Sequence, residues 1–199
     1  MINLEQAVAN SYRNFHAKGL DYICLSRTEK MTQKLYILDG DASKVPEVVN
    51  PHDHRYPFHT MVLHGKMADH RWLRGQPGME DLDDARVYKA FDYMTPLNGG
   101  DGFTYRGEEV LVRTLESVME PGDSLTTQAQ HVHTIQMLAD QTVLLLNQFA
   151  DIYPADKPTS TWSQDTPSIS DDGLYERFTE GQIVDRLASM GFSVKEVAA

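Results

Sequence analysis

The stretch Pro51-His52-Asp53-His54-Arg55-Tyr56-Pro57-Phe58-His59 contains three of the eight histidines of this sequence. His52 and His54 are two residues apart, and residues at that spacing in a β-strand point to the same face. Two imidazoles that share one space form a geometry that binds a metal ion. The stretch therefore predicts half of a metal site, carried on extended chain.

A second pair of histidines, His131 and His133, has the same spacing much later in the chain. A single histidine on a strand is more often a structural or surface residue than a ligand. Two His-X-His pairs in a chain of this size favour a shared site. We therefore expect the two stretches to face each other inside a β-barrel and to bind one metal ion. Each ligating imidazole would be neutral and oriented by a hydrogen-bond acceptor on its other nitrogen.

Most of the chain between residues 20 and 150 consists of short apolar or alternating segments separated by turn signals. Gly65 divides one pair of these segments, predicted as a hairpin, and Pro121-Gly122-Asp123 is a strong turn. The segment 109–119 suits a strand, although a helix is also compatible with it. The predicted strands are 22–26, 35–38, 58–64, 66–72, 85–94, 109–119, 124–128, 131–138 and 142–149. This pattern predicts an all-β barrel or double-sheet jelly roll.

Helices are predicted at both ends of this barrel. Residues 3–18 have apolar side chains at helical spacing, with Asn3 as a plausible N-cap and Gly19 as a stop. Residues 153–173 are rich in Pro, Ser, Thr and Asp and are expected to form a surface crossing or an active-site flap. A helix is expected over 174–190. The prediction is one domain over residues 1–199, with a barrel core at about 20–150, an N-terminal helix at 3–18 and a C-terminal loop and helix at 151–199.

Composition narrows the classes of function. The chain has 199 residues, is 41% hydrophobic and 24% charged, and has a formal net charge of −11. An acidic surface repels nucleic-acid phosphates and anionic membranes, so neither is an expected partner. The N-terminal residues lack a signal-peptide pattern. Cys24 is the only cysteine, which rules out an intrachain disulfide and favours a reducing cytoplasm. We expect Cys24 to be a buried core residue.

Both histidine stretches resemble the motifs of a known family. His52-X-His54-X4-His59-X5-Gly65 resembles the first cupin motif, in which two histidines, a carboxylate and a glycine fall at these spacings. Pro121-Gly122-Asp123 followed by His133 resembles the second motif, in which Pro-Gly-Asp precedes the last metal-binding histidine. The resemblance covers about residues 20–150. It implies a cupin double-stranded β-helix, which is a jelly-roll barrel.

The resemblance also implies a ligand set. His52, His54 and His133 match the family's metal-binding histidines. His59 stands where the family has its carboxylate, so a three-histidine site with His59 nearby and a four-histidine site are both open. His131 is the alternative to His133, which is favoured by its interval from Pro121-Gly122-Asp123.

Among cupins, the sequence is most similar to the thiol dioxygenases, which bind Fe(II) through three histidines. That resemblance implies a mononuclear non-haem iron dioxygenase acting on a small molecule and O2, such as a thiol carboxylate like cysteine. Arg27 stands at the interval of the family's arginine that binds the substrate carboxylate. The family's catalytic Ser-X-His-X-Tyr motif is missing from residues 146–150. Tyr153 could substitute for its tyrosine only with a shift along the chain.

Two other functions fit a cupin metal site. With Zn, Mn or Ni, the protein would polarise a carbonyl group and act as an isomerase or lyase without O2. The second alternative is a non-catalytic barrel that binds a small ligand. A homodimer is implied by the cupin resemblance alone.

Overall fold

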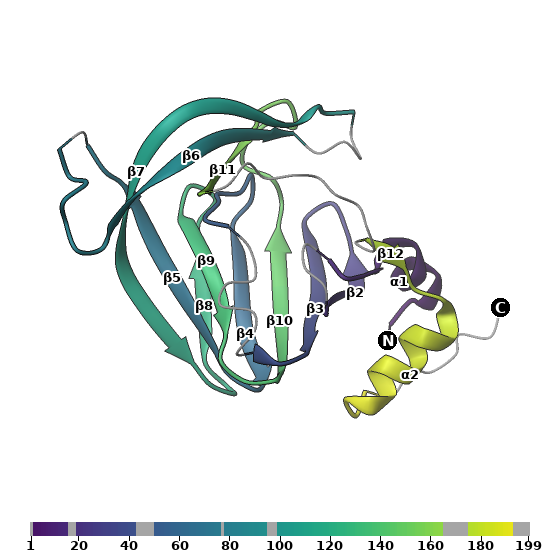
Figure 1. Cartoon of the computed structure of the whole chain (residues 1–199). Helices are drawn as coiled ribbons and strands as arrows, with labels where there is room; N and C mark the ends of the chain where they lie inside the picture. The colour runs from purple at the N-terminus through teal and green to yellow at the C-terminus, as the bar shows by residue number, and fades with distance from the viewer. Residues whose placement is uncertain are drawn as a thin grey trace.

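The computed structural model describes residues 2–15, 19–42, 50–76, 78–94, 99–164 and 175–192. Two curved antiparallel sheets make up most of the molecule (Figure 1). The seven-stranded sheet has the order β12 (Glu176–Arg177), β1 (Tyr12–Arg13), β2 (Leu20–Arg27), β3 (Met31–Asp39), β10 (Gln141–Phe149), β4 (Phe58–His64) and β8 (Ser124–Thr127). The five-stranded sheet has the order β11 (Thr159–Ser163), β6 (Ala85–Met94), β7 (Gly102–Met119), β5 (Met67–Arg74) and β9 (Val132–Met137).

These sheets confirm the predicted all-β fold with flanking helices, and their arrangement is that of the jelly-roll barrel which the cupin resemblance implies. The segment 109–119 is part of a long strand, β7, and not a helix. The predicted hairpin at Gly65 is wrong, because β4 and β5 belong to different sheets. Gly65 has a φ of +78° at the corner between the sheets, and a Cβ there would overlap the Gln141 carbonyl oxygen. A glycine is therefore needed at this corner.

Strand β3 shows how the barrel acquires both a core and a cavity. Its side chains alternate between the two faces of the seven-stranded sheet. Leu35 and Ile37 pack outward against the helices in one apolar cluster. Lys34 and Tyr36, on the opposite face, line a cavity inside the barrel. Strand β3 is therefore largely buried on both faces, although its inner face carries polar side chains.

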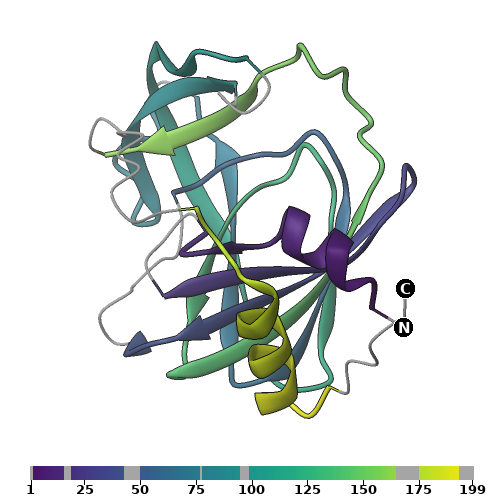
Figure 2. The same cartoon turned by 90° about the vertical axis from the view of Figure 1, so that its right-hand side faces the viewer.

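The two helices lie outside the seven-stranded sheet, as Figures 1 and 2 show from two directions. Helix α1 spans Leu4–Asn10 and helix α2 spans Glu180–Ser189. Ala7 of α1 and Ile183 and Leu187 of α2 are fully buried against the outer face of the sheet. Within the described ranges, no helix is long and apolar enough to cross a membrane.

The N-terminal helix predicted over residues 3–18 is wrong in its length. It ends at Asn10, with Asn3 as its N-cap, as predicted. Ser11 is extended, and its hydroxyl accepts a hydrogen bond from the Cys24 backbone N–H (2.9 Å). Tyr12 then pairs with Tyr22 of β2. The apolar residues continue at helical spacing past Ser11, but there the chain pairs with the edge of the sheet and is not helical.

The C-terminal part of the chain also departs from its prediction. The crossing predicted over 153–173 contains β11, which pairs with β6, and Trp162 of β11 is fully buried. The helix predicted over 174–190 begins only at Glu180, after the short strand β12. Thr179 caps α2, and its N–H donates to the Gln182 side chain in a capping box.

Candidate metal centre

The segment that contains His52 and His54 is not a regular strand, contrary to the geometry predicted for it. It runs between the edges of two strands instead. His52 exchanges two backbone hydrogen bonds with His133 of β9 (3.2 and 3.1 Å) and also bridges Thr161 of β11. The His54 N–H donates to the carbonyl of Ala129 (2.9 Å). The backbone thus pairs the two histidine motifs directly, residue against residue.

Three imidazoles meet at this pairing. One ring nitrogen from each of His52, His54 and His133 lies within 4.8 Å of the others. Nε2 of His54 lies 3.1 Å from Nε2 of His133. Two nitrogens that bind one metal at about 2.1 Å and at a right angle are about 3.0 Å apart. The spacing between these two nitrogens therefore suits neighbouring ligands of a single ion.

The other nitrogen of two of these rings has a partner that can only accept. His133 Nδ1–H donates to the Asp69 carboxylate (2.8 Å), and His52 Nδ1–H donates to the Asn50 carbonyl (2.8 Å). Both contacts place the proton on Nδ1, so the lone pair is on Nε2, as it is in an imidazole that binds a metal through Nε2. Ligating histidines are oriented in this way in metal sites. The donor set thus fits a metal held by three neutral histidines.

Asp69, on β5, is a part of the site that the sequence reasoning missed. Its side chain is only 3% exposed and forms an ion pair with Arg71 (Oδ2 to Nε, 2.6 Å). Its other oxygen accepts from His133. The sequence held one signal for it, because a carboxylate in the middle of a largely buried strand needs a partner.

The structure does not bring His59 or His131 to the other three. His59 lies between Phe58 and Thr60, which both line the inner cavity, so its side chain points to the other face of β4. There its Nδ1 lies 3.1 Å from the Thr126 hydroxyl. The expectation that His59 lies near the metal is therefore wrong.

His131 is an exposed residue just before β9. Its Nδ1 accepts a hydrogen bond from Arg71 (3.3 Å). Desolvation and the Arg71 charge lower the pKa of His131. Of the second histidine pair, only His133 reaches the cluster, with its side chain buried.

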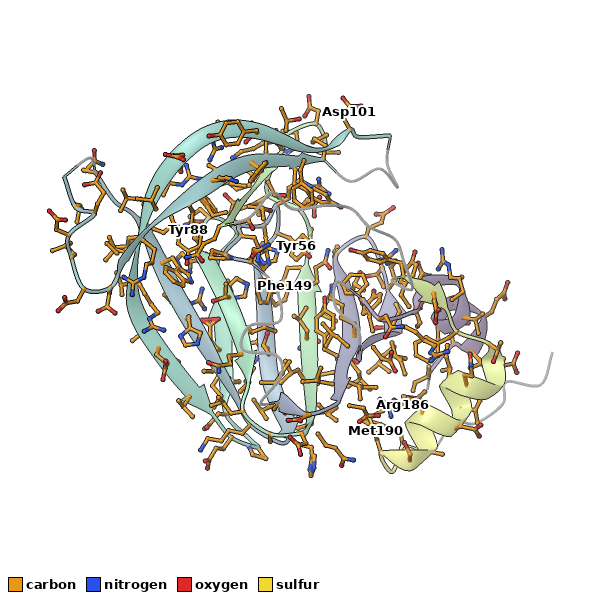
Figure 3. All side chains as sticks on the ribbon, viewed as in Figure 1. Tyr56, Tyr88, Asp101, Phe149, Arg186 and Met190 are labelled. Carbon is orange, nitrogen blue, oxygen red and sulfur yellow. The ribbon has the colours of Figure 1, made fainter. Side chains whose placement is uncertain are left out.

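The three histidines line a cavity of about 110 Å³ inside the barrel, the inner cavity. Its wall is mostly apolar and aromatic and includes Tyr36, Tyr56, Phe58, Leu144 and Leu146. Figure 3 shows Tyr56 inside the barrel. The ring of Tyr56 lies 5.3 Å from that of His54, and the ring of Phe58 lies 4.8 Å from it. A small molecule in this cavity would therefore touch the histidines and an aromatic wall.

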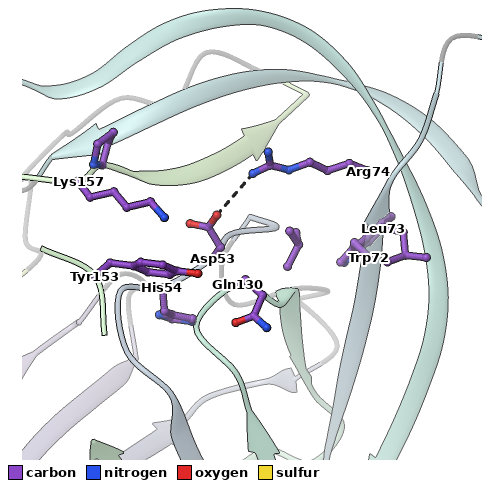
Figure 4. Close-up of a pocket in the computed structure, with 10 residues that line it drawn as sticks. Asp53, His54, Trp72, Leu73, Arg74, Gln130, Tyr153 and Lys157 are labelled. Atoms are coloured by element: carbon purple, nitrogen blue, oxygen red, sulfur yellow. Dashed lines mark ion pairs between the residues drawn. The ribbon is translucent and has the colours of Figure 1, made fainter. Parts of the chain in front are cut away.

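A second, more polar pocket of about 320 Å³, the outer pocket, lies on another side of His54 (Figure 4). Tyr153 lines it, with Lys157 Nζ 3.2 Å from the centre of its ring. Arg74 and Asp53 form an ion pair across it (3.6 Å). Burial raises the pKa of Asp53. The structure thus places Tyr153 beside His54, in the outer pocket and not among the residues that line the inner cavity.

Arg27 does not have the position expected of a substrate anchor. It lines neither pocket, it is exposed at the end of β2, and its guanidinium donates to the Asn10 side chain (2.8 Å). The inner cavity has a different basic residue, Lys34 of β3, which is buried. The sequence reasoning missed Lys34. The sequence held one signal for Lys34, which directly precedes the apolar run 35–38. The residues two positions away on the same strand face, Thr32 and Tyr36, are uncharged.

Comparisons with known proteins found no matching family model and no matching curated protein. Solved structures do match. A cupin superfamily protein from Desulfitobacterium hafniense is 12% identical, with a TM-score of 0.37, over 66% of this chain and 78% of its own. An RmlC-like cupin from Shewanella frigidimarina is 14% identical, with a TM-score of 0.40, over 72% and 87%.

Hydroxypropylphosphonic acid epoxidase from S. wedmorenis is 13% identical, with a TM-score of 0.42, over 75% of this chain and 59% of its own. With TM-scores below 0.5, these similarities carry no argument about this chain. Its assignment as a double-sheet barrel rests on the strand order described above.

Proposed function

We propose that this protein is a mononuclear non-haem iron dioxygenase that acts on a small molecule in the inner cavity. One observation carries the proposal: three histidine nitrogens converge at the wall of a small cavity, and two of the rings are fixed with Nδ1 as the donor. His52, His54 and His133 would hold the iron, which would supply the electron transfer between the substrate and O2.

The chain's own residues have three tasks in this proposal. His52, His54 and His133 hold the ion, and Asp69 holds the proton of His133 on Nδ1. The apolar side chains of the inner cavity, among them Phe58, keep bulk water away from the reacting groups. Ferrous iron and the unpaired thiol of Cys24 both suit a reducing compartment, so cytoplasm is part of the proposal.

Small thiol carboxylates such as cysteine are the first substrates to test, because of the resemblance to the thiol dioxygenases. The structure departs from what that resemblance implies at two residues. Arg27 is hydrogen-bonded to Asn10 and does not line the inner cavity, and Tyr153 lies in the outer pocket. The proposal for the reaction class therefore stands on the histidine cluster, and the thiol is a narrower hypothesis within it.

The test is oxygen uptake by protein purified without a histidine tag and loaded anaerobically with Fe(II). We expect uptake that depends on a small thiol or a related small acid and that falls at least about 100-fold in His52→Ala, because one of three ligands is lost. The matched control is His64→Ala, which removes an exposed histidine at the end of β4. It should keep the wild-type rate.

Three other outcomes would contradict parts of the proposal. Turnover of a substrate without O2 by the Zn, Mn or Ni form would favour an isomerase or lyase. Ligand binding that survives His52→Ala/His54→Ala, in a protein that takes up no metal, would favour a non-catalytic binding barrel. Full iron occupancy with no uptake on any small thiol would reject the thiol hypothesis.

A further inference from the structure

Lys34 has a buried amino group at the wall of the inner cavity. Lys34 is only 4% exposed, and its Nζ donates one hydrogen bond, to the Gln148 side-chain carbonyl (2.8 Å). The rings of Tyr22, Tyr36 and Tyr56 surround it, with centres 5.1, 5.5 and 5.8 Å from Nζ. Aromatic faces favour a cation, but each such contact is much weaker than a carboxylate at hydrogen-bond distance.

Among the described residues, no carboxylate within ion-pair distance balances the charge of Lys34, whose one polar partner there is the neutral Gln148. The charged or titratable groups that act on it most are Arg27 and Cys24, both on β2. Arg27 is a second positive charge and opposes that of Lys34. Burial of an ammonium group without an anion is costly, so proteins pair such groups or leave them neutral. An anion in the cavity would supply the missing partner.

We propose that Lys34 forms an anion-binding subsite, which holds the carboxylate of a small monocarboxylate while the other end of the molecule faces the three histidines. The inference rests on the proposed function in that both place the substrate in the inner cavity. Tyr56 connects the subsite with the histidines, because its ring lies close to both Lys34 Nζ and the ring of His54. A cavity of about 150 Å³ holds benzene, so about 110 Å³ limits the ligand to a short acid.

The subsite should couple anion binding to proton uptake. Burial, with a smaller contribution from Arg27, lowers the pKa of Lys34 to about 7. Burial raises the pKa of Tyr56 to about 12, raises the pKa values of Tyr22 and Tyr36 well above their usual range, and raises that of the Cys24 thiol. These neighbours therefore stay neutral at neutral pH, whereas Lys34 changes charge there.

The protonation of Lys34 sets how the affinity for a carboxylate depends on pH. A carboxylate binds the ammonium form of Lys34 and not the amine. Carboxylates are ionised throughout the neutral range. The affinity that depends on Lys34 should fall by up to about tenfold for each pH unit above pH 7.

The experiment measures the dissociation constant of propionate by ligand-observed NMR, on the protein as purified and after metal removal. Wild type is compared with Lys34→Met, which keeps most of the side-chain volume, and with Lys30→Met, which changes an exposed lysine between β2 and β3. We expect Lys34→Met to weaken propionate binding at least about tenfold, because a charge-assisted hydrogen bond is lost. The decrease in propionate affinity above pH 7 should also disappear in this variant. Lys30→Met should match wild type. Propionamide, which is neutral, should bind wild type as weakly as propionate binds Lys34→Met.

Equal propionate affinity in wild type and Lys34→Met would overturn the inference, and so would equal affinity for propionate and propionamide. A fold check accompanies the measurement: Lys34→Met should melt no lower than wild type, because it removes a buried charge. Iron content separates this inference from the proposed function. Lys34-dependent binding in a protein that takes up no iron would reject the dioxygenase and keep the subsite, whereas full iron occupancy with Lys34-independent binding would do the reverse.

Discussion

His54→Ala is expected to abolish stoichiometric iron binding. His54 provides one of three clustered nitrogens, and its Nε2 is the one 3.1 Å from Nε2 of His133. Loss of a group that only orients a ligand costs about 10- to 100-fold in metal affinity, so loss of a ligand itself should cost more than about 100-fold. The measurement is anaerobic titration with Fe(II), in competition with a chelator of known affinity.

His64→Ala is the matched control for that titration, since His64 is exposed and lies at the far end of β4. It should bind one equivalent of iron, as we expect of wild type. Thermal melting of each variant shows that the barrel is intact. Wild-type affinity in His54→Ala would mean that the metal, if bound, has other ligands.

Asp69→Asn is expected to weaken metal binding about 10- to 100-fold. The carboxylate accepts the Nδ1 proton of His133 and so keeps Nε2 available, and its charge makes the imidazole a stronger ligand. An amide can present its NH2 to Nδ1 instead, which favours the wrong tautomer. Arg71 would also lose the charge of its partner.

The effect of Asp69→Asn is measured by the same competition titration, with denaturant unfolding to separate folding from affinity. Breaking a buried pair also costs stability, so affinity is compared only under conditions where both proteins are folded. Asp83→Asn, an exposed carboxylate in the loop before β6, is the control. An Asp69→Asn protein that binds iron as wild type does would remove Asp69 from the site.

The sequence predicted which histidines lie together better than it predicted the backbone that carries them. The spacing of His52 and His54 predicts a regular strand, yet their segment is held by single bridges to β9 and β11. The rings still face one space, 4.6 Å apart between centres. Spacing along the chain predicted the pair of motifs, and only long-range pairing could show that His52 lies directly beside His133.

Two predicted site residues, His59 and Arg27, do not line the inner cavity, and the reasons differ. His59 follows Phe58, whose side chain points into the barrel, so His59 must point out of it. The family motif matches His59 by its interval along the chain, and that interval does not say to which face of the strand the side chain points. The reason for Arg27 is its place at the exposed end of β2, where its guanidinium donates to Asn10 of α1.

The strand β11 was not predictable from local pattern. Thr159–Ser163 lies within a segment rich in Pro, Ser, Thr and Asp, which is typical of a loop. It is a strand because β6 offers an edge and because Trp162 fills the space under Arg74, whose guanidinium lies 4.8 Å from its ring. Such tertiary contacts outweigh β-propensity, which is strongly dependent on context.

The central claim is that His52, His54 and His133 bind one metal ion. Anomalous X-ray diffraction at the iron edge, from crystals grown anaerobically with Fe(II), tests it most directly. The account predicts one strong anomalous peak about 2 Å from a ring nitrogen of each of the three histidines, with Asp69 still bonded to His133. Iron density elsewhere, or none at these three side chains in crystals that contain iron, would contradict it.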